Sequence, residues 1–219
     1  MKKLETLLAI VLMFSVSACN KYHDSTKLTS QGETQGYAWA DLGLPSGTLW
    51  ATCNMGAAEP EGRGYYYGWG MTTDLKEWPG DNYYEYTDTM YNNEGILKPE
   101  CDAATANWGS EWHTPTKAQF TEMINNCTFK WVERKGQEGY LITGRNGNKI
   151  FLPAAGFLTE EGVIHNNRYC EYWSSSLEDS SLPYNVLAWA FNADFYDWNM
   201  QTHERQNAQN IRPVCQKAN

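Results

Sequence analysis

Residues 108–127 read WGSEWHTPTKAQFTEMINNC, and this stretch predicts the main helix of the chain. Phe120, Met123, Ile124 and Cys127 recur at the spacing of one helix face, while the residues between them are polar. A helix with one apolar face must pack against another layer. We therefore expect this helix to be the central element of one domain.

Both ends of this helix carry end signals. Thr114 followed by Pro115 favours a start in which threonine caps and proline occupies the first helical position. Thr116 with Gln119 offers an alternative start through a capping box. The pair Asn125-Asn126 suits the exit, which places the helix at about residues 114–126.

Composition favours one β-rich exported domain. The chain has 219 residues, of which 42% are hydrophobic, and it contains 10 Trp and 14 Tyr. Large aromatic residues are typical of strands, so a helical bundle is disfavoured. The formal net charge is −9, and the basic residues form no cluster. Nucleic acid is therefore excluded as an expected partner.

Residues 1–18 resemble a bacterial lipoprotein signal peptide. Lys2 and Lys3 precede an apolar run over residues 7–16, and the segment 16–19 reads VSAC. By this resemblance, Cys19 carries the lipid, and the lipid attaches the chain to the membrane. An ordinary secretory signal with a nearby cysteine is the alternative. The resemblance implies a lipoprotein of the outer membrane, facing either the periplasm or the cell surface.

The polar segment after Cys19 predicts a tether. Residues 19–38 have little to bury and no apolar period, so we expect the folded domain to span residues 39–216. Five cysteines remain within the domain, with no Cys-x-x-Cys pair and no zinc spacing. They could form one or two disulfides or stay as small buried side chains. They are Cys53, Cys101, Cys127, Cys170 and Cys215.

Alternating apolar residues predict short antiparallel strands. A Pro-Ser-Gly turn at residues 45–47 leads into a strand near 49–53. Residues 129–133, 139–143 and 148–152 form an expected three-stranded meander, whose second turn contains Asn146-Gly147. Further strands are expected at 172–175, 186–192 and 210–215. The fold class is therefore α+β, with one main helix and short antiparallel strands.

Six segments in order resemble the Fibrobacter succinogenes major paralogous domain, which recurs in exported bacterial lipoproteins. They are DLGLPSGTLWATCN at 41–54, YGWG at 67–70, DAA with NWG at 102–109, GNKIFLPAAG at 147–156, YWSSS at 172–176 and IRPVC at 211–215. The resemblance implies a single C-type-lectin-like domain, similar to the fold of the formylglycine-generating enzyme. His113 departs from the family, which usually has arginine there.

The related enzymes use paired cysteines with copper or three histidines with iron, and neither set can be identified in this sequence. His113, His165 and His203 occur singly, without a metal-binding spacing. No serine lies in a nucleophile elbow. We therefore expect no catalytic residues, and an enzyme of the formylglycine-generating type remains the alternative.

Two ligand-binding sites are expected from side-chain chemistry. Asp194, Asp197 and Asn199 offer three oxygen ligands in one loop, which is the chemistry that calcium prefers, although solvated loop acids are the simpler interpretation. No other cofactor is expected. The long segment 71–100 and its flanks gather aromatic rings that could stack on a sugar or contact a surface protein. These rings are Trp69, Trp78, Tyr83, Tyr84, Tyr86 and Tyr91.

The sequence thus supports three hypotheses. The first is a non-catalytic, lipid-anchored binding or adhesion module of the cell envelope, whose ligand is a glycan or a protein. The second is the metal-dependent enzyme, and the third is a structural component of a surface appendage.

Overall fold

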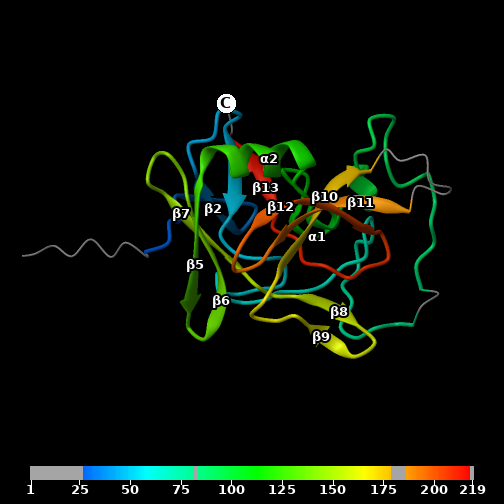
Figure 1. Ribbon diagram of the computed structural model, residues 1–219. Helices are drawn as coiled ribbons and strands as arrows, with labels where there is room; N and C mark the ends of the chain where they lie inside the picture. The colour runs from blue at the N-terminus through cyan, green and yellow to red at the C-terminus, as the bar shows by residue number, and fades with distance from the viewer. Residues whose placement is uncertain (1–26, 81–82, 179–185, 218–219) are drawn as a thin grey trace, which may run out of the picture.

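The computed structural model describes residues 27–80, 83–178 and 186–217 (Figure 1). The expected signal peptide and the lipidation residue Cys19 lie outside these residues. Antiparallel strands dominate the described chain, and one main helix accompanies them. This arrangement is compatible with the expected α+β class. No helix among the described residues is long and apolar enough to cross a membrane.

The largest sheet joins the two ends of the described chain. Its five antiparallel strands lie in the order β1-β2-β3-β13-β4, and in its centre Val214 is opposite Trp50 of β3 and His113 of β4. The last strand in chain order is therefore an interior strand. The five strands are β1 (Gly32–Thr34), β2 (Tyr37–Asp41), β3 (Thr48–Ala51), β13 (Val214–Gln216) and β4 (Trp112–His113).

Residues 32–38 differ from the expected tether. Gly32 pairs with Trp39 and Thr34 with Tyr37, so β1 and β2 form a hairpin on the edge of the five-stranded sheet. Gln35 and Gly36 form its turn with positive φ angles of 50° and 84°. The folded part therefore begins before residue 39. The polar sequence concealed this because an edge hairpin needs few apolar side chains.

The main helix, α2 (Lys117–Asn126), begins at the second of the two expected starts. Thr116 is its N-cap, and the reciprocal bonds of a capping box join Thr116 and Gln119. Thr114 instead donates its hydroxyl proton to Oδ1 of Asp102 over 2.8 Å. The same carboxylate caps a short helix, α1 (Ala103–Trp108). The first expected start is wrong because the Asp102 carboxylate binds the threonine that would have capped it.

Two three-stranded sheets and a hairpin complete the fold. The expected meander is confirmed, with Trp131 opposite Tyr140 and Tyr140 opposite Leu152. The second sheet has the order β10-β11-β12, and α2 contacts all three of its strands (Figure 1). The meander is β5 (Thr128–Arg134), β6 (Gln137–Thr143) and β7 (Lys149–Pro153); the others are β8 (Phe157–Thr159), β9 (Gly162–Ile164), β10 (Cys170–Leu177), β11 (Leu187–Ala193), β12 (Trp198–Glu204) and a 3-10 turn, η1 (Pro99–Cys101).

The core lies on both faces of β10. Tyr172 packs into a cluster with Phe120 and Met123 of α2, whereas its neighbour Trp173 packs into a second cluster with Trp69 and Trp112. Successive strand residues point to opposite faces, so one strand serves both clusters. Large aromatic side chains thus fill much of the interior of a domain that is poor in leucine.

Candidate functional site

The aromatic loop expected to bind a ligand is partly core. Trp69 is 1% exposed and Tyr84 is 8% exposed, and the indole N–H of Trp69 donates to the carbonyl oxygen of Ser174 over 2.8 Å. These two rings therefore differ from the expectation, because their faces are covered by protein. Trp78, Tyr83, Tyr86 and Tyr91 are half-buried.

These rings surround the side chain of Arg205. Its fully buried guanidinium lies 4.8 Å from the ring centroid of Trp69 and between 5.6 and 5.8 Å from those of Tyr84, Tyr86 and Tyr91. Nε also donates to the hydroxyl oxygen of Tyr84 over 3.2 Å. The rings stabilise a desolvated cation through their negative faces. The loop is therefore organised around a cation of its own chain.

The expected calcium ligands form a turn rather than a shared oxygen cage. Oδ1 of Asp194 accepts the backbone N–H groups of Tyr196 and Asp197 over 2.7 and 3.0 Å, and Oδ1 of Asp197 accepts that of Trp198. Asn199 lies on β12, opposite Asn192. Each carboxylate thus has one oxygen committed to fixing the β11–β12 turn. Over the ranges that the structure describes, no three His, Cys, Asp or Glu side chains gather as a metal site.

The five expected domain cysteines are all free thiols. Burial raises the pKa of Cys127 and of Cys215 to about 11, and it raises the pKa of the fully buried Cys170 as well. A thiol must lose its proton to act as a nucleophile or a metal ligand. These three are therefore inert at neutral pH, in agreement with the interpretation of small buried side chains.

The three domain histidines have separate neighbours. Nε2 of His113 lies 3.2 Å from the side-chain oxygen of Gln119, His165 contacts the rings of Phe157 and Tyr169, and His203 contacts Trp173. Burial lowers the pKa of His113 and of His203. The structure does not bring them together.

A small aromatic pocket stands out on the surface. Phe195 and Tyr196 are 62% and 85% exposed, and with Tyr65 they are the exposed large hydrophobic side chains of the described residues. They line a pocket of about 230 Å³, which we call the aromatic pocket. Exposed aromatic side chains often mark binding sites. The pocket is lined by Trp131, Glu138, Asn167, Arg168, Tyr169, Asp194, Phe195 and Tyr196.

A continuous series of ring contacts connects this pocket to the core. Phe120 of α2 stacks on Phe191, and Phe129 contacts Phe191 and stacks on Trp198. Further contacts then lead outward to the pocket, through Trp198–Tyr140, Tyr140–Trp131, Trp131–Phe195 and Phe195–Tyr196. The hydroxyl of Tyr140 donates to the carbonyl oxygen of Asp194 over 2.6 Å. Buried groups thus fix the turn that presents Phe195 and Tyr196.

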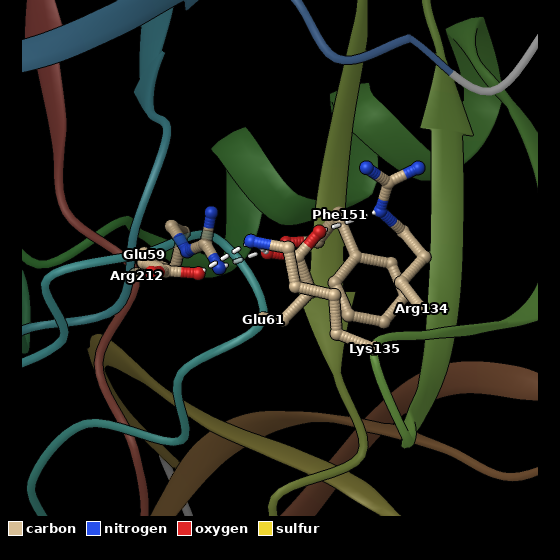
Figure 2. Close-up of polar contacts among 6 residues, drawn as sticks. All are labelled: Glu59, Glu61, Arg134, Lys135, Phe151 and Arg212. Carbon is tan, nitrogen blue, oxygen red and sulfur yellow. Dashed lines mark hydrogen bonds and ion pairs between the residues drawn. The ribbon is translucent and has the colours of Figure 1, made fainter.

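The β5–β6 hairpin that supplies Trp131 and Glu138 is fixed at its tip. Nε of Arg134 donates to Oε1 of the buried Glu61 over 2.8 Å, and Lys135 pairs with Glu59 over 2.5 Å (Figure 2). Although burial opposes it, the hydrogen bond and charge of Arg134 hold the pKa of Glu61 below its usual value. Glu61 therefore stays ionised at neutral pH, and its pairing with Arg134 holds the hairpin against the 59–61 loop.

The other side of the hairpin is tied to Asn167, which also lines the pocket. Oδ1 of Asn167 accepts from Nε2 of Gln137 over 2.6 Å and from the backbone N–H of Glu138 over 3.0 Å. Asn167 has a φ of 61°, a conformation that asparagine tolerates better than most residues. The walls of the pocket are thus pre-organised, which lowers the entropy cost of binding.

Two larger hollows contain aromatic rings whose faces are already occupied. A groove of about 740 Å³ beside α2 contains Trp189, but Nζ of Lys117 lies 3.2 Å from the centroid of that ring. A hollow of about 400 Å³ contains Tyr37 and Trp108, which stack on each other at 3.8 Å. The aromatic pocket is a better candidate site than these two hollows, because its rings Phe195 and Tyr196 are exposed to solvent.

Sequence reasoning missed Trp131, Phe195 and Tyr196 as site residues. A signal was available, because residues 194–197 read Asp-Phe-Tyr-Asp. Turns favour Gly, Asn, Asp, Pro and Ser, so two large rings at a turn between strands are unusual. Trp131 could not be found this way, since only the fold brings β5 beside the β11–β12 turn.

Comparison with known proteins gives no match: no family model fits the chain, and no curated protein or solved structure is significantly similar to it.

Proposed function

We propose that this chain is a lipid-anchored, non-catalytic binding module of a bacterial cell envelope, with its ligand held at the aromatic pocket. The observation that carries the proposal is the exposure of Phe195 and Tyr196 beside Glu138 and Asp194. Aromatic faces contribute apolar contact area at a small cost in conformational entropy, while carboxylates orient a polar ligand.

The site fits a small ligand group. Its volume of about 230 Å³ is below the range of pockets that enclose a drug-sized molecule. One sugar ring of a glycan, or one side chain of a surface protein, suits this size. We therefore place the recognition element of the ligand here rather than in the 71–100 segment.

Further details of the proposal come from the sequence. The lipid on Cys19 would hold the domain at the outer membrane, and the segment before β1 would act as the tether. We further propose a C-type-lectin-like architecture of the Fibrobacter succinogenes major paralogous type. Three features support this assignment: the capped main helix, the core of aromatic and aliphatic side chains, and the buried Arg212 of the segment 211–215.

The binding part can be tested with a glycan array and a panel of envelope proteins. The full chain would be purified in a polyoxyethylene detergent, which presents no sugar, and probed with calcium and with a chelator. We expect specific binding that Tyr196→Ala reduces at least tenfold, whereas Tyr65→Ala leaves it unchanged. Tyr65 is the matched control because its exposed ring does not line the pocket. Binding that both variants retain would overturn the assignment of this site.

The anchoring part has a separate test. We expect Cys19→Ala to move the protein from the membrane fraction to the supernatant and to abolish incorporation of labelled palmitate. Membrane association that survives this substitution would contradict the lipid anchor, while leaving the aromatic pocket unaffected.

A further inference from the structure

The rings of the aromatic pocket meet nearly at right angles. Trp131 and Phe195 have ring centroids 6.1 Å apart and an angle of 76° between their planes. Phe195 and Tyr196 have centroids 5.1 Å apart and an angle of 86°. Successive rings therefore form corners instead of one flat platform.

Such corners favour a compact cation over a flat ring. A sugar ring stacks on a single broad face, whereas perpendicular faces can surround a rounded group from two sides. The face of each aromatic ring carries negative charge, so a cation in the corner interacts with more than one ring. Alkylated ammonium groups have this rounded shape and are weakly hydrated.

Two carboxylates strengthen this preference. Oε2 of Glu138 accepts from the indole N–H of Trp131, and Oδ1 of Asp194 is bonded to its own turn. In the described part of the chain, Oε1 of Glu138 and Oδ2 of Asp194 have no hydrogen-bond partner. Arg168 is the basic residue of the lining, and it is exposed to solvent. The charges of the lining are thus negative on balance.

We propose, on the basis of the proposed function, that the ligand presents an alkylammonium group to the corners that Phe195 forms with Trp131 and with Tyr196, with Glu138 and Asp194 supplying the opposite charge. An anionic ligand is disfavoured by the same carboxylates.

The test compares choline with 3,3-dimethylbutan-1-ol, which has the same shape without the charge. Binding to the full chain in polyoxyethylene detergent would be measured by saturation-transfer NMR and calorimetry. We expect choline to bind about tenfold more tightly than the neutral isostere, as one cation–π contact and a nearby carboxylate allow. Tyr196→Ala should abolish the difference.

The charge contribution has its own variants. Glu138→Gln and Asp194→Asn keep an oxygen that can accept the existing hydrogen bonds, and each should weaken choline binding several-fold. Glu161→Gln is the control, since it removes the same charge from an exposed turn outside the pocket. Equal weakening by Glu161→Gln would overturn the local role of the two carboxylates.

The outcomes separate this inference from the proposed function. Equal or tighter binding of the isostere, or binding of a neutral sugar that Tyr196→Ala removes, would overturn the ammonium preference and retain the binding site. Absence of binding by choline and by every array ligand would overturn both.

Discussion

The indole N–H of Trp131 donates a hydrogen bond to Oε2 of Glu138 over 2.8 Å. This bond fixes one ring of the aromatic pocket. We expect Glu138→Ala to lower the free energy of unfolding by about 1 kcal/mol, because the indole loses its partner. Glu138→Gln should lose less, since its amide oxygen can accept the same bond. Denaturant titration gives the energies, and near-UV circular dichroism reports the ring. Equal losses in the two variants would contradict this account.

The buried Glu171 should make stability depend on pH. It is 4% exposed, its Oε1 accepts from Nδ2 of Asn192 over 3.4 Å, and its Oε2 has no partner among the described residues. Burial raises its pKa from 4.5 to about 7. Between pH 4.5 and 7 the folded state therefore binds more protons than the unfolded state, so protonated Glu171 favours folding at low pH. This stabilisation is lost as the pH rises through 7.

We accordingly expect this residue to favour folding at pH 5 over pH 8 by at most about 3 kcal/mol. Thermal unfolding across this range would show it as a falling melting temperature. Glu171→Gln should make the melting temperature less dependent on pH. The exposed Glu161→Gln should keep the pH dependence of the wild type. A Glu171→Gln variant with an unchanged slope would show that this carboxyl is not the titrating group.

Replacing Arg205 should loosen the aromatic loop. Arg205→Met keeps the length of the side chain but leaves the hydroxyl of Tyr84 and the carbonyl oxygen of Thr87 without their donor. We expect a loss of about 3 kcal/mol or more in the free energy of unfolding. Limited proteolysis should show faster cleavage within residues 83–91. The exposed Arg145→Met is the control, and the proposal fails if both variants are cleaved at the wild-type rate.

Alanine substitutions at two glycines would distinguish the cost of backbone strain from the cost of a steric clash. Gly136 and Gly156 both have positive φ, at 81° and 65°, but a Cβ on Gly156 would lie 1.9 Å from the carbonyl oxygen of Ile164, and one on Gly136 would meet nothing within 4 Å. We expect Gly136→Ala to cost about 1 kcal/mol, from backbone strain alone. Gly156→Ala should cost clearly more, as measured by chemical denaturation. Similar losses would contradict the clash at Gly156.

Local signals predicted the elements that local chemistry determines. The apolar stripe with Phe120 and Met123 gave the main helix, and the Asn146-Gly147 turn with alternating residues gave the meander. The start of the helix depended on Asp102, whose side chain binds Thr114 from twelve residues away. Competition between two good caps is decided by such a contact, which sequence order does not show.

The candidate site was harder to predict because burial is a long-range property. Trp69 and Tyr84 are the same kind of residue as Phe195 and Tyr196, yet the first pair surrounds Arg205 and the second faces solvent. β12 was also missed, since its residues 198–204 are half-buried or exposed and the strand lies at the edge of its sheet. The sequence shows which residues are aromatic, but tertiary packing decides which of their rings are exposed to a ligand.

The position of β13 between β3 and β4 also has a consequence for biosynthesis. Both neighbouring strands are made long before residues 214–216 emerge from the ribosome, and until then each keeps an unpaired edge where β13 will insert. The five-stranded sheet therefore cannot close before residues 214–216 have been synthesised. This late closure delays the complete folding of the sheet until residues 214–216 are available to pair.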